Sequence, residues 1–386
     1  MPRKNSIDRA VLRAAVAFEI GRNKRQQVIG NTLRISQSEV SRLRSEAEEH
    51  GWLGPPSFRV ADHEVWRRAE ELFYSTGALC DELRRFVGPR GRLLHRIVLL
   101  HTGYDGRIDA GAVAFFGQLF RDARTVGVTW GRTISRVVDA LQQRNASTPV
   151  TNKSHPVTFV PLCGEPLADG DPSSHSSSVL AQRLTEIFNG GSTAVSSPSI
   201  AGVQAFIPLK VGQLDKSPTI QHLFSMVRGH ARVFGTPDGP SGNGPPLVQN
   251  LSGILTSIGR VDRDRRGTFL TERIQVGDIS EEQMLRSVAG DIGGVIIPKS
   301  GIRADDEQLI DAMNRNWTGV RLEHLHQCAK AALADGFGPE RPGVVVLALG
   351  AERVQVVLRC LQLGIVNQLV INKALADGLT THLQSG

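Results

Sequence analysis

Five consecutive residues, Thr129-Trp130-Gly131-Arg132-Thr133, combine the groups that proteins use to bind anions. A β-branched run before them predicts a strand that ends at Thr129, and a helix is predicted to begin at Arg132. The start of a helix presents unpaired backbone N–H groups, Gly131 lets a ligand approach the backbone, and Arg132 can pair with a phosphate. The segment therefore predicts an anion site; an ordinary strand-to-helix turn is the alternative.

A second group of residues has the spacing of a helix-turn-helix. Gly30 is the small residue that lets two helices cross closely, and Ile35 is the apolar residue of the turn. Ser36 is the predicted N-cap of the next helix, and Glu39 is expected to complete a capping box. Arg34 stands where such turns usually carry a left-handed Gly, so we expect a strained or differently shaped turn.

The exposed side of this predicted unit carries residue types that contact DNA. Gln can bond to adenine, and Arg to guanine or phosphate, in the major groove. The alternative is a small helical bundle with a polar surface. The predicted DNA contacts are Arg25, Gln26, Ser36, Gln37, Ser38, Ser41, Arg42 and Arg44.

Charge is concentrated in the same part of the chain. The 386 residues have a net charge of +7, and residues 1–60 hold eleven Lys or Arg against six Asp or Glu. Most of the excess therefore lies in under a sixth of the length, as is typical of a protein that binds the phosphate backbone. A solvated basic surface is the alternative explanation.

Composition excludes several other classes of protein. The four cysteines lie far apart without a CxxC pair, which argues against a disulfide framework or a zinc site. The start of the chain, MPRKNSIDRA, has no apolar signal region, and no apolar run reaches the roughly 18–20 residues of a membrane span. We therefore expect a cytoplasmic protein with no membrane contact, no metal and no cofactor.

The elements that must position these residues divide the chain into three parts. Helical periodicity predicts helices over 7–19, 25–33 and 37–50, forming an all-α helix-turn-helix domain at 1–56. A connecting helix over 62–87 is predicted within a connecting and possible oligomerisation segment at 57–91. From residue 92 to 386, short apolar runs alternate with helices, which predicts an α/β effector domain, Rossmann-like, with a mainly parallel sheet.

With these residues in view, the chain resembles the SorC/DeoR-type sugar-binding transcriptional regulators over nearly its whole length. The order and spacing of several segments carry the resemblance. They are Ile35–Leu43, Gly51–Leu53, Val126–Thr133, Val160–Gly164, Gly290–Gly294 and Val346–Gly350. The resemblance implies an effector domain with a fold like that of sugar-phosphate isomerases such as ribose-5-phosphate isomerase. It also implies a homo-oligomer, a dimer or tetramer, whose grip on operator DNA changes when a phosphorylated sugar or related metabolite binds.

The resemblance also implies which residues contact the ligand. Asp291 would accept hydrogen bonds from sugar hydroxyls, although a turn aspartate is the alternative. Two segments depart from the family pattern. Leu349-Gly350 stands where relatives have two glycines, with Arg353 in place of a Lys, and Asn372-Lys373 replaces acidic residues. The predicted ligand set is Thr129, Trp130, Gly131, Arg132, Thr133, Gly164, Glu165, Asp291, Gly350, Arg353 and Lys373.

These observations predict a DNA-binding transcriptional regulator, not an enzyme, that is controlled by a small, phosphorylated sugar or polyol-derived metabolite. Two alternatives stay open. An isomerase-like enzyme would need an acid–base pair, and His101, His324 and His326 form no recognisable constellation. A DNA-binding scaffold with a decayed effector pocket would explain the two departures from the family pattern.

Overall fold

The computed structural model describes most of the chain and divides it into two compact units. The described residues are 8–21, 25–50, 52–54, 57–58, 76–100, 108, 110–147, 155–165, 175–190, 197–236, 245–261 and 268–385. The N-terminal unit is Met1–Ala78 and the C-terminal unit is Leu79–Gly386. The division falls inside the predicted connecting segment, of which residues 59–75 lie outside the described residues. The predicted boundaries after residues 56 and 91 stay predictions.

The N-terminal unit contains the three predicted helices and one element that the sequence did not predict. The helices are α1 (Arg9–Gly21), α2 (Gln26–Leu33) and α3 (Gln37–Glu49). A short antiparallel hairpin follows, with β1 (Leu53–Gly54) paired to β2 (Ser57–Phe58). The prediction of an all-α domain is therefore wrong. Leu53 pairs with Phe58 and Gly54 with Ser57, so strand pairing joins the residues on both sides of 55–56.

The C-terminal unit is built on a mixed sheet with a parallel body. Neighbouring strands follow the order β3-β10-β9-β6-β4-β5, and every pairing along this path is parallel. β7 pairs antiparallel with the far end of β6, and β8 pairs antiparallel with β7. The strands are β3 (Arg96–Leu99), β4 (Thr125–Val128), β5 (Thr158–Pro161), β6 (Gly253–Arg260), β7 (Val288–Ile292), β8 (Val295–Pro298), β9 (Gly343–Ala348) and β10 (Gln368–Ile371).

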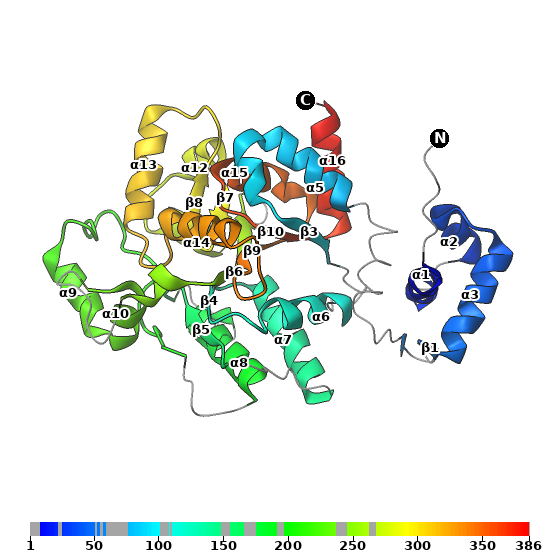
Figure 1. Ribbon diagram of the computed structural model, residues 1–386. Helices are drawn as coiled ribbons and strands as arrows, with labels where there is room; N and C mark the ends of the chain where they lie inside the picture. Colours follow the sequence, from blue (N-terminus) through cyan, green and yellow to red (C-terminus); the bar gives the residue numbers. More distant parts are fainter. Residues whose placement is uncertain are drawn as a thin grey trace. The chain divides into compact units, whose positions relative to one another are not determined.

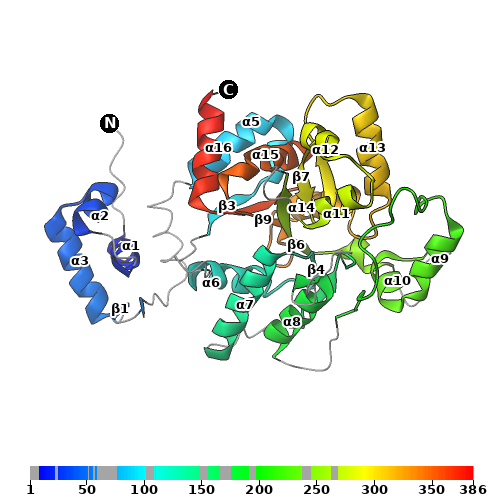
Figure 2. The same ribbon diagram turned by 180° about the vertical axis from the view of Figure 1, so that it is seen from behind.

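Helices cover both faces of the parallel body, as its continuous apolar strands require. In Figures 1 and 2, α6, α7 and α8 lie on one side of the sheet, while α5, α14 and α15 lie on the other. The helices of this unit are α5 (Thr76–Val87), η1 (Gly88–Leu93), α6 (Ala110–Leu119), α7 (Arg132–Ser147), α8 (Ser177–Asn189), α9 (Pro218–Met226), α10 (Arg228–Phe234), η3 (Leu247–Asn250), α11 (Thr268–Gln275), α12 (Glu281–Ser287), α13 (Ala304–Arg315), α14 (Leu322–Ala334), η4 (Ala351–Arg353), α15 (Val354–Leu363) and α16 (Lys373–Ser385).

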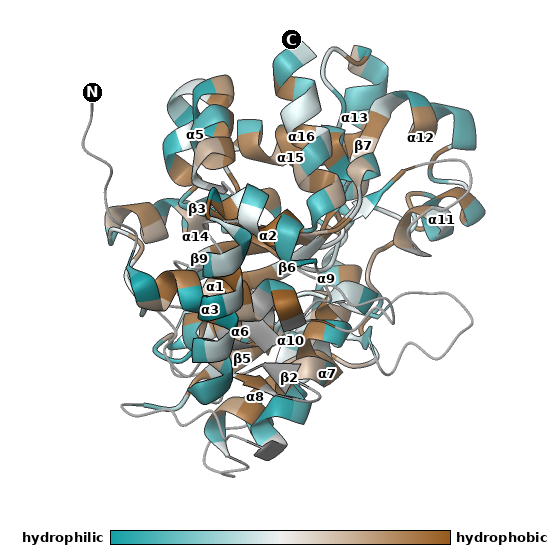
Figure 3. Cartoon of the chain, turned by 90° about the vertical axis from the view of Figure 1, so that its right-hand side faces the viewer, coloured by the Kyte–Doolittle hydropathy of each residue, from teal (hydrophilic) through white to brown (hydrophobic). Residues whose placement is uncertain are grey.

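Two apolar clusters form the core, one on each face of the sheet. One contains Phe116 and Phe120 of α6 with residues of α7 and α8, and the other contains Leu325 of α14 with residues of α15. Helices such as α12 and α13 alternate hydrophilic and hydrophobic colours along their length, as expected when one face packs on a core (Figure 3). Leu79 and Leu83 of α5 are buried in the second cluster, so this part of the predicted connector belongs to the C-terminal unit.

Candidate functional site

The third helix of the N-terminal unit has one apolar and one polar face. Val40, Leu43 and Ala47 are fully buried against α1 and α2. The predicted DNA contacts lie on the other side: Arg25, Ser36, Gln37, Ser38, Ser41, Arg42 and Arg44 are exposed, and Gln26 is half-buried. The polar face of α3 is therefore available to a groove of duplex DNA, as a recognition helix requires.

The crossing of α2 and α3 depends on a glycine. A Cβ added to Gly30 would lie 2.9 Å from the backbone oxygen of Ile35 and 3.6 Å from a methyl group of Val40. Arg34, at the end of α2, has φ 55° and ψ 42°, which is the left-handed conformation that glycine usually adopts. The expectation of strain at this turn is therefore confirmed.

The start of α3 is capped, but only half of the predicted capping box is present. The Ser36 hydroxyl accepts a hydrogen bond of 3.1 Å from the backbone N–H of Glu39. The carboxylate of Glu39 does not return to Ser36 in the described structure; it is bound by Arg9 and Arg42. Electrostatic attraction to two guanidinium groups outcompetes a single neutral N–H donor.

The cations on this face differ in how firmly they are held. Arg42 pairs with Glu39, and Arg44 pairs with Glu48 at 2.9 Å; both arginines are exposed. Within the described part of the chain, Arg25 and Arg34 have no ion-pair partner. Exposed ion pairs contribute little to stability. Arg42 and Arg44 can therefore leave their partners Glu39 and Glu48 and bind a phosphate at little cost in free energy.

In the C-terminal unit, consecutive residues of β6 contact two of the predicted ligand residues, Thr129 and Arg353. The order of strands reverses between β4 and β6, and open α/β sheets bind ligands at the carboxyl ends of the strands at such a point. Thr256 bonds to Thr129, and the N–H of Gly293 donates to the carbonyl of Ser257. The next residue, Ile258, accepts a hydrogen bond of 3.1 Å from Arg353 Nε.

The predicted anion site lies in the segment between β4 and α7. Gly131 has φ 131°, and an added Cβ would lie 3.0 Å from Ser257 Oγ. Arg132, the first residue of α7, is exposed, and neither it nor Thr133 has a side-chain polar partner in the described structure. The hydroxyl of Thr129 is not free, because Thr129 is fully buried and donates to Thr256 at 3.0 Å.

Asp291 lies at the end of β7, beside a tight turn. Gly293 and Gly294 both have positive φ, and they connect β7 to β8 as a two-residue hairpin turn. Asp291 is 6% exposed, and its Oδ2 accepts the Gly294 N–H at 3.1 Å. Burial raises the pKa of Asp291 to about 6, although the Gly294 N–H and the nearby Arg353 oppose the shift.

Gly164 and Glu165 follow β5 and pair with a neighbouring segment. The N–H of Glu165 donates to the carbonyl of Val203, and a Cβ on Gly164 would clash with the same backbone. Burial raises the pKa of the Glu165 carboxyl, while a hydrogen bond from Ser176 opposes the shift. The Glu165 and Asp291 carboxylates also both raise the pKa of the buried Cys163 thiol, after burial itself.

The residues of the two departing segments have different surroundings. Arg353 is four-fifths buried at the carboxyl ends of β6 and β9, where it binds the carbonyls of Ile258 and Leu349. Lys373 is 71% exposed and pairs at 2.9 Å with Asp377, one turn along α16. Among the described contacts none joins Lys373 to the rest of the predicted ligand set.

Several residues at this edge were not predicted from the sequence. Trp317 and Phe269 lie 5.7 and 6.1 Å from the half-buried ring of Trp130, forming an aromatic wall beside the predicted anion site. Thr256 and Ser257 are polar residues within an otherwise apolar run, and this pattern could have marked them as site residues. Asn372 accepts hydrogen bonds from the N–H groups of Gly350 and Leu375. Within the described residues, no group of His, Cys, Asp or Glu is arranged to hold a metal, and no helix is long and apolar enough to cross a membrane.

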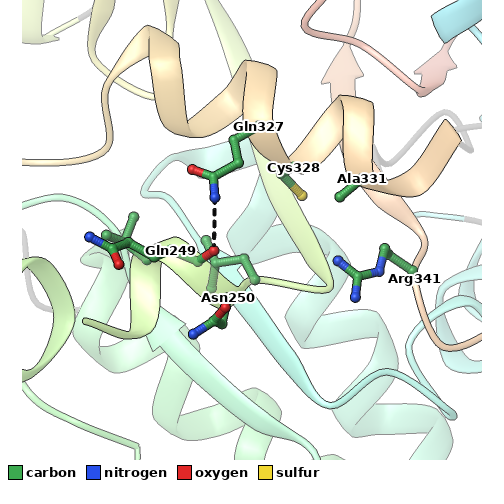
Figure 4. Close-up of a pocket in the computed structure, with 8 residues that line it drawn as sticks. Gln249, Asn250, Gln327, Cys328, Ala331 and Arg341 are labelled. Atoms are coloured by element: carbon green, nitrogen blue, oxygen red, sulfur yellow. Dashed lines mark hydrogen bonds between the residues drawn. The ribbon is translucent and has the colours of Figure 1, made fainter. Parts of the chain in front are cut away.

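A surface pocket of about 230 Å³ lies at the opposite edge of the sheet. It is lined by η3, α14 and Arg341; Leu251 and Arg341 come just before β6 and β9, at their amino ends. Figure 4 shows Gln327 donating to the backbone oxygen of Gln249 across it. The pocket is therefore separate from the predicted ligand residues, which follow the carboxyl ends of the strands.

Comparison with known proteins identifies the fold. No family model matches the sequence, and no curated protein matches it. The full-length sorbitol operon regulator SorC from Klebsiella pneumoniae matches with a TM-score of 0.50 at 16% identity, covering 95% of this chain and 97% of that one. A DeoR family transcriptional regulator from Listeria monocytogenes matches with a TM-score of 0.46 at 17% identity, covering 79% of this chain and 100% of that one.

The match to SorC covers both units, so this chain shares the fold of a full-length sugar-operon regulator. The resemblance predicted from the sequence is confirmed at the level of fold. The roles of individual residues in DNA and ligand binding stay predictions.

Proposed function

We propose that this chain is a DNA-binding transcriptional regulator whose α3 contacts operator DNA. In this proposal the C-terminal unit binds a small sugar or polyol-derived metabolite that carries a phosphate-like anionic group, and the protein acts in the cytoplasm as a homo-oligomer without catalysing a reaction. The observation that carries the proposal is the two-faced α3. Three fully buried apolar residues anchor it, while Gln37, Ser41 and Arg42 are exposed together.

Support for the effector comes from the start of α7. Gly131, the exposed Arg132 and the first amides of a 16-residue helix suit an anionic group, and Trp130 offers an aromatic surface beside it. SorC, whose fold the chain shares, is a sorbitol operon regulator, and this favours a polyol or sugar over other small anions.

Selection from a random duplex library tests the proposal. The full chain is incubated with random double-stranded DNA, and bound duplexes are recovered and sequenced over several rounds. We expect enrichment of a motif made of two half-sites related by two-fold symmetry, because homo-oligomers of this kind contact paired half-sites. A pool that stays random, while the protein remains folded, would contradict the proposal.

The enzymatic alternative retains one supporting observation, the raised pKa values of Asp291 and Glu165 at one edge of the sheet. Incubating the purified protein with aldose and ketose phosphates distinguishes the two functions. We expect no interconversion, and thermal stabilisation by a ligand that is not consumed.

A further inference from the structure

The carboxylate of Glu352 occupies a position beside two guanidinium groups. Its Oε1 lies 2.8 Å from Arg260 Nη1 and 2.5 Å from Arg353 Nη1. The carboxylate also folds back over Gly350, where an added Cβ would lie 2.4 Å from its oxygens. Gly350 has φ 104° and no side chain, so another group can approach its backbone closely. The group that does so is the Glu352 carboxylate.

Arg353 is held in place independently of Glu352. Its Nε binds the carbonyl of Ile258, and its Nη1 also binds the carbonyl of Leu349, so backbone groups of two strand ends fix the guanidinium. Burial alone would raise the pKa of Glu352, but its own N–H and the two guanidinium groups lower it below the ordinary value. Glu352 is therefore ionised near neutral pH and acts as a permanent counter-charge at this position.

The other cationic position of the predicted ligand site has no such counter-charge. Arg132 at the start of α7 is exposed and has no side-chain partner within the described residues. Consecutive residues of β6 connect the two positions, because Ser257 lies against Gly131 and Ile258 binds Arg353. One edge of the sheet thus carries two places suited to an anion, one open and one already filled.

We propose that Glu352 is an internal anion that restricts the effector to a single anionic group. This inference rests on the proposed function: the site binds that group at the start of α7 and rejects sugars phosphorylated at both ends. A second phosphate would meet the Glu352 carboxylate at Arg353. Displacing the carboxylate would replace one ion pair of Arg353 with another, so the binding free energy would not improve.

Isothermal titration with a hexose monophosphate and a hexose bisphosphate tests this inference. We expect the wild-type chain to bind the monophosphate at least about tenfold more tightly, because like charges repel at the filled position. Glu352→Gln should bind the bisphosphate about tenfold more tightly than the wild type does, with the monophosphate affinity nearly unchanged. Adding Arg353→Ala to that variant should remove the gain.

Glu340→Gln is the matched control, because Glu340 is an exposed carboxylate near the amino end of β9 whose nearest cation, Arg124, is 3.9 Å away. It should leave both affinities unchanged. Equal wild-type affinity for the two sugars, or unchanged discrimination in Glu352→Gln, would overturn the inference while leaving the proposed effector intact. If no phosphorylated sugar binds wild type or variant while DNA binding persists, the proposed effector fails together with the inference.

Discussion

Asp291 is a buried carboxyl whose ionisation links stability to pH. Its folded pKa of about 6 lies above the ordinary 3.8, so folding disfavours the charged form. The stabilising contribution of the protonated group is complete below about pH 4 and is lost as pH rises through 6. The full shift corresponds to at most about 3 kcal/mol, because one pKa unit is about 1.4 kcal/mol.

Asp291→Asn should therefore stabilise the protein at pH 8 relative to the wild type, with the difference shrinking toward pH 4. Urea unfolding at both pH values measures this. An amide keeps an oxygen that can accept the Gly294 N–H, so the fold should survive. If both proteins lose the same stability between pH 4 and 8, Asp291 is not the linked group.

Arg132 is the residue on which the proposed anion site most depends. Arg132→Ala should weaken binding of a sugar monophosphate by about tenfold to a hundredfold, because a charge-assisted hydrogen bond at a helix start is lost. Arg136→Ala is the control, since Arg136 is an exposed cation on the same helix one turn further on. Titration calorimetry should show that Arg136→Ala keeps the wild-type affinity. An equal loss of affinity in both variants would mean that general electrostatic attraction, and not a site at Arg132, binds the phosphate.

At the scale of elements, the crossing of α2 and α3 tests how the N-terminal unit is built. Gly30→Val should destabilise this unit by about 1–3 kcal/mol, because the added group collides with the turn at Ile35. Hydrogen exchange should accelerate at α1–α3 amides while amides of the parallel sheet keep their protection. Gly77→Ala, which meets no atom within 4 Å, should leave exchange in α1–α3 unchanged.

The elements that the sequence predicted correctly are those with strong local periodicity. The short apolar runs predicted within residues 92–386 include the strands β3, β4, β9 and β10, and the three N-terminal helices each have a single apolar stripe. The β7–β8 hairpin was recognised only as a ligand motif. Its Gly293-Gly294 pair between apolar residues is typical of a two-residue hairpin turn and could have predicted the hairpin.

The arrangement of the site was predictable only in part. The positive φ of Gly131 and the start of α7 at Arg132 follow from a local sequence pattern, so this part of the proposed site could be predicted. The bond between Thr129 and Thr256 joins residues 127 positions apart and depends on the pairing of β4 with β6. The placement of Glu352 over Gly350 depends on one side-chain conformation, which neither spacing nor composition specifies.

At the scale of the whole molecule, the proposed homo-oligomer predicts how the two half-sites of the operator are spaced. A homo-oligomer that presents two copies of α3 should prefer half-sites whose centres lie a whole number of helical turns apart, about 10.5 base pairs each. Inserting about five base pairs between the selected half-sites turns one to the opposite face of the duplex. Affinity should then fall toward that of a single half-site. Unchanged affinity, measured by gel shift, would contradict paired binding.

The most direct test of the account is the affinity of the selected duplex for an α3 variant, measured by fluorescence anisotropy. Arg42→Ala should weaken binding by about tenfold to a hundredfold, because one base or phosphate contact contributes about 1–3 kcal/mol. Arg124→Ala removes an exposed cation from the C-terminal unit and should leave the affinity unchanged. Equal affinity of Arg42→Ala and wild type, with α1–α3 still folded, would contradict DNA binding through α3.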